Sequence, residues 1–332
     1  MKLFRLIKFI VCCAVLLLWF TILSAQRKDS ITAERKKIIV TSSIDGTAQP
    51  SYIYLPATMQ AGRKIPLVVL LHTWSNNLEQ RFKPLEEQVA NRGWLLLEPD
   101  FRGRNNHPEA CGSILAQQDI LDAVASVKKN YSIDKNRIYL VGFSGGGYLT
   151  MLMTALYPKN WAAASAWCGI SDLTQWYDFH KSDQYGEMMR NCFGGAPGQS
   201  DSIGLQFRNR SPITWLSKST PVPLDIAAGR RDSIVPAGHS ISAFNMLANA
   251  SGLPVISKEE IDKILGPDTS AFQSMGNQIY TDSILGRRIF LRRQEGKYRI
   301  TIFEGTHEWV PAAAMQWFDR YIKKRNRKLN GN

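Results

Sequence analysis

The chain has 332 residues, of which 44% are hydrophobic, and it carries a formal net charge of +13 at pH 7. This length suits one large domain or two small ones, and the apolar fraction suffices for a substantial core, which excludes a chain without a folded interior. The sequence holds no nucleic-acid-binding motif, so the positive charge favours an anionic small substrate or a glycan over DNA or RNA.

The start of the chain has the pattern of a cleavable export signal, in which basic residues precede an apolar run and then small residues. These are Lys2, Arg5 and Lys8, then 9–23, then Ser24 and Ala25. The apolar run is shorter than the roughly 20 residues that a membrane-spanning helix needs. We therefore predict a signal peptide over 1–25, with an uncleaved anchor as the alternative, and a folded domain over 26–332. A secreted or periplasmic location without a stable membrane partner follows.

Three cysteines remain after the predicted signal, namely Cys111, Cys168 and Cys192. An exported chain meets an oxidising compartment, in which disulfides persist. An odd number of cysteines permits at most one bridge within the chain. Cys111 and Cys192 both lie in loop-like sequence and can pair, and three unpaired cysteines are the alternative.

Strand-like segments alternate with helix-like segments along most of the chain. Apolar and β-branched runs predict strands over 36–42, 51–55, 65–72, 94–101, 138–143, 161–170, 223–228 and 298–303. Helical spacing of apolar residues predicts helices over 78–91, 117–131, 148–156, 236–250 and 309–324. This order predicts an α/β fold with a mostly parallel central sheet and helices on both faces. A hairpin at Asp45–Gly46 adds antiparallel strands at one edge.

Two longer segments interrupt this alternation. Residues 171–216 lie between two predicted strands and are rich in aromatic, glycine and polar residues. Connections of this length are usually functional or mobile, and we expect this one to cover the carboxyl ends of the strands as a cap. Residues 252–293 form a second insertion, whose end continues into a predicted hairpin at Glu295–Gly296.

Residues 137–148, with the sequence RIYLVGFSGGGY, carry the clearest chemical signal. An apolar strand ends near Gly142, Ser144 follows between glycines, and an apolar helix then begins. This order predicts a nucleophile elbow, in which the serine is held in a strained turn beside the free N–H groups of the helix. Neighbours without a Cβ atom let strand and helix pass closely. The alternative is a glycine-rich turn with a solvated serine.

A serine hydroxyl becomes nucleophilic when a base takes its proton, and the base needs an acid to orient it. His307 follows the last predicted strand and precedes the last helix, where an imidazole can reach the elbow. For the acid we favour Asp232, just past the penultimate strand, over Asp172, which follows the strand before it. The alternative role for Asp232 is a helix N-cap.

The reaction also needs hydrogen-bond donors for the developing oxyanion. The backbone N–H of Gly145, next after the serine, is the first candidate. The second comes from the loop after the strand over 65–72, where we favour the Trp74 amide, with Thr73 as the alternative. This loop lacks the consecutive glycines that many such loops contain.

The motifs GFSGG, GRRDSIVP and GTHEW, with LLHTW and PDFRG upstream, resemble the α/β-hydrolase superfamily. The resemblance covers about residues 50–325 and is strongest to the secreted prolyl-oligopeptidase-like and feruloyl or acetylxylan esterase-like branches. It implies a serine hydrolase with an acyl-enzyme intermediate and without a metal or other cofactor. It also implies that Ser144, Asp232 and His307 form the catalytic triad.

Candidate substrate contacts are Trp176, Tyr148 and Arg102. Exposed aromatic faces stack on sugars or aryl groups, whereas buried ones belong to the core. Arg102 can bind a substrate carboxylate through two hydrogen bonds, or it can form a salt bridge with Glu98 or Asp100. We expect a secreted esterase that removes acetyl, methyl or feruloyl groups from a small-molecule or glycan ester. A serine exopeptidase or oligopeptidase is one alternative, and an inactive binding protein on the same scaffold is another.

Overall fold

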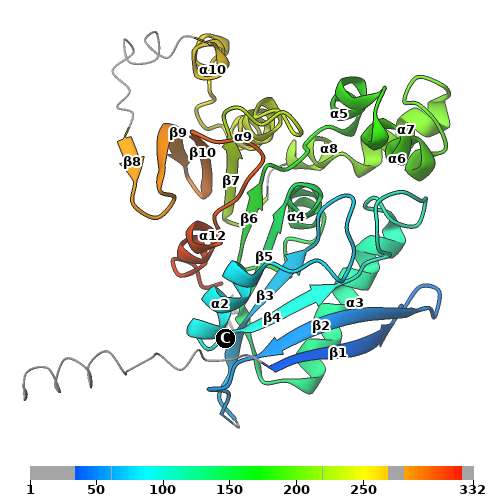
Figure 1. The fold of residues 1–332 in the computed structure, drawn as a ribbon, viewed down its shortest axis with the longest axis vertical. Coiled ribbons are helices and arrows are strands. Elements are labelled where there is room, and N and C mark those ends of the chain that lie inside the picture. The colour runs from blue at the N-terminus through cyan, green and yellow to red at the C-terminus, as the bar shows by residue number, and fades with distance from the viewer. Residues whose placement is uncertain (1–33, 61, 219, 268–279, 324–332) are drawn as a thin grey trace, which may run out of the picture.

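The computed structural model describes residues 34–60, 62–218, 220–267 and 280–323 (Figure 1). The predicted signal peptide over 1–25 lies outside these ranges, as does part of the predicted second insertion. Within the described ranges, we find no helix with the length and apolar character needed to cross a membrane.

Ten strands form one sheet in the order β1-β2-β4-β3-β5-β6-β7-β10-β9-β8. They are β1 (Glu34–Thr41), β2 (Ala48–Leu55), β3 (Ile65–Leu71), β4 (Leu95–Pro99), β5 (Ile133–Phe143), β6 (Ala163–Trp167), β7 (Leu224–Gly229), β8 (Tyr280–Asp282), β9 (Arg287–Glu295) and β10 (Tyr298–Phe303). The central strands from β4 to β10 pair in parallel, and antiparallel pairs flank them on both sides. The predicted α/β fold with a mostly parallel sheet is confirmed.

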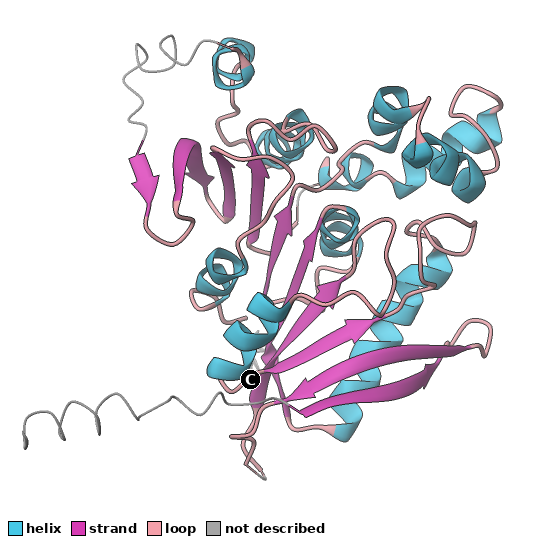
Figure 2. Ribbon diagram, in the orientation of Figure 1, coloured by secondary structure: helices cyan, strands magenta, loops and turns pink. Residues whose placement is uncertain are grey.

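Helices cover both faces of the sheet (Figure 2). One layer contains α2 (Lys83–Asn91) and α12 (Pro311–Phe318), and the other contains α3 (Ile114–Asn130), α4 (Gly145–Leu156) and α9 (Gly238–Ala250). Every residue of β3 is buried, because the strand lies between these two layers. This explains why its sequence is continuously apolar rather than alternating.

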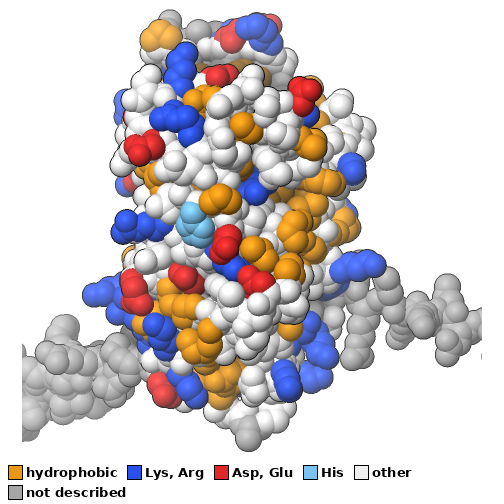
Figure 3. All heavy atoms as spheres, turned by 90° about the vertical axis from the view of Figure 1, so that its right-hand side faces the viewer, with side chains coloured by type: hydrophobic (Ala, Val, Ile, Leu, Met, Phe, Trp, Pro, Cys, Tyr) orange, Lys and Arg blue, Asp and Glu red, His pale blue; other side chains and the backbone are white. Residues whose placement is uncertain are grey.

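Residues 171–216 form four short helices, which the sequence did not predict. They are α5 (Leu173–His180), α6 (Gln184–Phe193), α7 (Asp201–Arg210) and α8 (Pro212–Leu216). Side chains of Asp172, Asp183 and Ser200 accept hydrogen bonds from the first-turn N–H groups of α5, α6 and α7. Such N-caps stabilise helices that are too short to form alone. Figure 3 turns the side of the molecule that carries α6 and α7 toward the viewer, and apolar side chains gather there among charged ones.

The second insertion begins with α10 (Lys258–Leu265), in which Ser257 and Glu260 form a reciprocal capping box. After the residues that are not described, it continues with the short strand β8, which pairs with β9. β9 then turns at Glu295–Gly296 and pairs with β10, as the sequence predicted.

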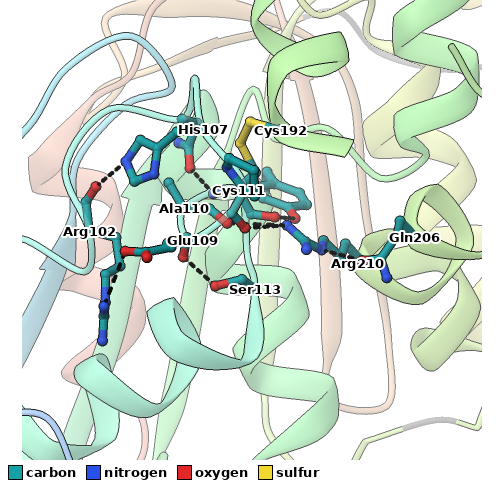
Figure 4. The surroundings of a disulfide bond; sticks show 12 residues. Arg102, His107, Glu109, Ala110, Cys111, Ser113, Cys192, Gln206 and Arg210 are labelled. Atoms are coloured by element: carbon teal, nitrogen blue, oxygen red, sulfur yellow. Dashed lines mark hydrogen bonds and ion pairs between the residues drawn. A yellow bond between two sulfur atoms is a disulfide. The ribbon is translucent and has the colours of Figure 1, made fainter. Parts of the chain in front are cut away.

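A disulfide between Cys111 and Cys192 ties the helical insertion to the body of the molecule (Figure 4). The bridge joins the loop before α3 to helix α6, with 6.2 Å between the two Cα atoms. This is the pairing that the sequence allowed. The third cysteine, Cys168, is free and buried.

We predict that the Cys111→Ala/Cys192→Ala double variant unfolds more easily than the wild type. The bridge spans 81 residues, so its loss enlarges the set of conformations open to the unfolded chain. The free energy of unfolding, measured by urea titration, should fall by about 2–4 kcal/mol. Reduction of the wild type should give a similar loss and leave the double variant unchanged. Equal stability of all four samples would contradict the prediction.

Burial of Glu98 in β4 predicts a pH-dependent stability. Burial, with a further contribution from the charge of Glu86, raises the pKa of Glu98 to about 8. The folded protein therefore keeps a proton that the unfolded chain releases near the ordinary pKa of a glutamate. Stability should fall as the pH rises from about 5 towards 9, by about 1.4 kcal/mol for each unit that separates the two pKa values.

The test compares urea titrations of the wild type, Glu98→Gln and Glu87→Gln across this pH range. Glu98→Gln removes the ionisable group, so its stability should decline less at high pH. Glu87 is exposed on the neighbouring helix α2, and Glu87→Gln should follow the wild type. Parallel pH profiles for all three proteins would exclude the proposed effect of burial.

Candidate active site

Ser144 lies between the end of β5 and the start of α4 in a strained backbone conformation. Its φ is 58° and its ψ is −120°, a region that residues with a Cβ atom rarely adopt. Its N–H donates to the Trp167 carbonyl oxygen of the neighbouring strand β6 at 2.8 Å. Its side chain does not cap the helix. The turn therefore has the geometry of a nucleophile elbow, with a hydroxyl that makes no hydrogen bond to the first turn of α4.

The glycines around Ser144 permit this close approach. A Cβ atom at Gly142 would overlap the carbonyl group of Gly146, and one at Gly146 would overlap the Leu71 carbonyl oxygen at the end of β3. A Cβ atom at Gly145 would overlap the backbone nitrogen of Trp74. The strand, the helix and the loop after β3 thus meet at distances that only glycine allows.

His307 and Asp232 meet beside this elbow. Asp232 follows β7 and His307 follows β10, and these two strands are parallel neighbours in the sheet. His307 Nδ1 lies 2.7 Å from Asp232 Oδ2. The other carboxylate oxygen, Oδ1, accepts the N–H groups of Ile234 and Val235, each at 2.9 Å. The carboxylate is therefore fixed through one oxygen and holds the imidazole through the other.

The imidazole, held by Asp232, also contacts an aromatic ring of the elbow. The ring centroid of His307 lies 4.6 Å from that of Phe143, the residue that directly precedes Ser144. The tips of β5, β7 and β10 thus bring the three predicted triad residues to one edge of the sheet. Among the described residues, Ser144 Oγ makes no hydrogen bond to His307, and such a bond between a serine and its base often tightens only when substrate binds.

Asp172, the alternative acid, has a different role in the structure. Its Oδ1 accepts the N–H groups of Thr174 and Gln175 and so caps helix α5. Its oxygens make no hydrogen bond to His307, whereas Asp232 does. The alternative role for Asp232, that of an N-cap, is not found, because helix α9 begins at Gly238 with Ala237 as its N-cap and without a side-chain cap.

Two backbone N–H groups lie together where an oxyanion would form. Gly145 is the first residue of α4, so its N–H has no acceptor within the helix. The Trp74 N–H, packed against Gly145, has no acceptor among the described residues. The Thr73 N–H donates to Gln80 Oε1 at 2.8 Å and is therefore occupied. The geometry favours Trp74 over Thr73 as the second donor.

Arg102 does not face a ligand site but forms a buried ion-pair cluster, which corrects the prediction that it binds substrate. Its guanidinium pairs with Asp119 and Asp45 and also contacts Glu109. The sequence proposed Glu98 or Asp100 as structural partners, and these are not the ones found. The sequence did not indicate the pairing with Asp45, because it forms only when the β1–β2 turn folds back onto the loop after β4.

The two aromatic candidates, Trp176 and Tyr148, are also buried, so the prediction that they contact substrate is corrected as well. Trp176 packs edge-on against Trp74 with 4.9 Å between centroids, and its Nε1 donates to the Ile234 carbonyl oxygen. The Tyr148 hydroxyl donates to the Cys111 carbonyl oxygen at 3.2 Å. Both side chains therefore belong to the packed core next to the site.

Partly exposed aromatic side chains next to His307 form a further surface of the site, beyond the three predicted substrate contacts. Phe143 stacks against Trp309 with 6.2 Å between centroids, and Trp309 packs edge-on against Phe82. All three rings are half-buried. In the sequence, Phe143 has the pattern of a core residue of a strand. Its position directly before Ser144 was the one sequence signal that it could belong to the apolar wall formed with Trp309.

The sequence also did not single out Cys168, whose thiol lies behind the histidine–carboxylate pair. Atoms of Cys168, Asp232 and His307 lie within 4.8 Å of one another, the one such group found among the described residues. Burial, together with the charge of Asp232, raises the pKa of the thiol well above its ordinary value, so the sulfur stays protonated. A cation bound here would have to displace the hydrogen bond between Asp232 and His307.

The chain is similar to a family model and to several curated proteins. The family model described as BD-FAE matches residues 52–247, a range that includes Ser144 and Asp232 but not His307. Acylamino-acid-releasing enzyme 1 of Oryza sativa subsp. japonica is 28% identical over 193 residues, covering 53% of this chain and 24% of the relative. Feruloyl esterase B of Thermothelomyces thermophilus is 25% identical over 177 residues, covering 45% of this chain and 59% of the relative.

Among solved structures, an acylaminoacyl peptidase of Pyrococcus horikoshii matches 91% of this chain with a TM-score of 0.64 and 20% identity. The match covers 44% of that peptidase, so the likeness concerns the fold. The matched part of this chain likewise spans between 24% and 59% of the two curated relatives.

Proposed function

The chain belongs to the BD-FAE family, and on this premise we propose that it is a serine hydrolase that cleaves carboxylic esters through an acyl-enzyme intermediate. The observation that carries the proposal is the hydrogen bond between His307 and Asp232 beside the strained turn of Ser144. The backbone N–H groups of Gly145 and Trp74, which have no acceptor among the described residues, supply the donors that an ester oxyanion requires.

The proposed mechanism assigns one task to each group. The Ser144 hydroxyl attacks the ester carbonyl carbon while His307 Nε2 accepts its proton. Asp232 accepts the Nδ1–H and stabilises the imidazolium that forms. The N–H groups of Gly145 and Trp74 bind the oxyanion of the tetrahedral intermediate. Its collapse releases the alcohol, which takes the proton from His307, and water then hydrolyses the acyl-enzyme by the same steps.

We propose a carbohydrate ester, with an acetyl, methyl or feruloyl group, as the substrate. The half-buried wall of Phe143 and Trp309 beside His307 offers an apolar surface to an acyl or aryl group. The relatives include a feruloyl esterase and acetylxylan esterases. The relatives named as acylamino-acid-releasing enzymes support a second candidate, a serine peptidase that uses the same three residues.

Export from the cytoplasm is part of the same proposal. The disulfide between Cys111 and Cys192 supports it, because such bridges persist chiefly in oxidising compartments. A periplasmic or secreted location agrees with the signal peptide predicted over 1–25.

The first test separates an esterase from a peptidase and from an inactive scaffold. We expect the protein to hydrolyse nitrophenyl acetate and to react with a fluorophosphonate probe, and Ser144→Ala to lose both properties. Aminoacyl-nitroanilides should not be cleaved. Cleavage of the anilides would favour the peptidase, and absence of labelling in the wild type would show an inactive scaffold.

The second test identifies the acid. Asp232→Asn should lower turnover of nitrophenyl acetate by about 10³–10⁴-fold, because the amide cannot hold the imidazole in the required tautomer. Asp172→Asn is the matched control and should change turnover little, since asparagine caps a helix about as well as aspartate. A larger loss in Asp172→Asn would show that the wrong carboxylate was assigned.

A further inference from the structure

A second pocket lies away from Ser144, along the flank of helix α4. Its volume is about 370 Å³, and it lies between the loop before α3, the carboxyl end of α4 and helices α7 and α8. Gly112, Leu156 and Trp215 are among the lining residues. Ser144 lies at the opposite, amino-terminal end of α4. The pocket is therefore distinct from the candidate active site.

Arg210 is the charged side chain in the lining of this pocket, and it has no acidic partner. Its Nη1 donates to the backbone carbonyl oxygens of Pro108 and Ala110, and its Nε donates to Gln206 Oε1 at 3.1 Å (Figure 4). The guanidinium also lies 5.3 Å from the ring centroid of Phe193, and among the described residues it forms no ion pair with a carboxylate and its Nη2 has no acceptor. Burial lowers the pKa of Arg210, and no carboxylate counteracts this effect.

The groups around Arg210 suit a sugar. The exposed side chains of Gln206 and Asn209 line the pocket, and the Gln206 NH₂ group has no acceptor among the described residues. The half-buried ring of Trp215 lies on the same wall, and Lys218 Nζ stands 4.8 Å from its centroid. Amides bind hydroxyl groups in several geometries, and an indole face packs on a sugar ring.

We propose that this pocket binds a uronate residue of an acidic saccharide, whose carboxylate pairs with Arg210. A carboxylate would supply the charge that the guanidinium lacks and accept a hydrogen bond from Nη2. The sugar ring would lie against Trp215, and its hydroxyl groups would meet the amides of Gln206 and Asn209. The site holds a polymer at a distance from Ser144 and goes beyond the hydrolysis proposed above.

The disulfide keeps this site in place. Pro108 and Ala110, whose carbonyl oxygens hold Arg210, lie just before Cys111, and Cys192 belongs to helix α6 (Figure 4). Gly112 forms part of the floor and packs so closely on the Tyr148 hydroxyl that a Cβ atom would overlap it. The guanidinium is therefore presented from a rigid wall, which lowers the entropy lost on binding.

The test measures binding of trigalacturonate by isothermal titration calorimetry in a Ser144→Ala background. This background separates binding from hydrolysis, so the result does not depend on the proposed esterase activity. Trigalacturonate should bind, and its fully methyl-esterified form, which lacks the charges, should bind at least about tenfold more weakly. Adding Arg210→Gln should weaken trigalacturonate binding by a similar factor.

Arg208→Gln is the matched control, because Arg208 is exposed on the same helix α7 and does not line the pocket. It should leave binding unchanged. If Arg210→Gln fails to fold, Gln206→Glu serves instead: it gives Arg210 an internal carboxylate, so it should keep thermal stability and lose binding.

Three results would overturn the proposal. One is the absence of trigalacturonate binding, and another is an equal loss in Arg208→Gln and Arg210→Gln. The third is binding of N-acetyl-trialanine, but not of trigalacturonate, through Arg210. This last result would assign the pocket to the terminal carboxylate of a peptide.

Discussion

The hydrogen bond between His307 and Asp232 is the interaction on which the candidate active site depends. It forms because β7 and β10 are parallel neighbours in register, with Gly229 opposite Phe303, so the segments that follow them leave the sheet at the same edge. Gly229 has no side chain to obstruct the histidine loop, since a Cβ atom there would overlap the Thr306 carbonyl oxygen. A change that separates these two strands would remove the base from its acid without touching either residue.

The strain at Ser144 is maintained by the surrounding structure. Its positive φ persists because the close contacts of the neighbouring glycines with strand, helix and loop fix the backbone of the turn on three sides. Cys168, at the end of the neighbouring strand, also has a positive φ of 46° and directs its thiol to the Glu308 carbonyl oxygen in the histidine loop. Two strained turns on adjacent strands thus support the nucleophile and the base separately.

Sequence patterns predicted those features that depend on local order. The continuous apolar run of β3, the glycines around Ser144 and the place of His307 after the last strand each followed from neighbouring residues. Features that depend on contacts across the chain were predicted less well. Arg102 pairs with Asp45 and Asp119, which are 57 and 17 residues away, and Trp176 is buried against Trp74. Composition alone cannot distinguish a buried tryptophan from an exposed one, because both occur amid polar residues.

Arg102 and Arg210 show how the same side chain indicates different roles according to its partners. Arg102 lies in the loop between β4 and α3, Arg210 donates to carbonyl oxygens of the same loop, and both side chains are largely removed from solvent. Arg102 is surrounded by carboxylates, so its charge is balanced within the fold and it acts as a structural clamp. Among the described residues, Arg210 has only uncharged partners, namely carbonyl and amide oxygens and the Phe193 ring, although a buried charge is costly without a counter-charge. A fold that balances the charge of Arg102 fully and leaves that of Arg210 unbalanced at the wall of a pocket is suited to receive the missing charge from a ligand.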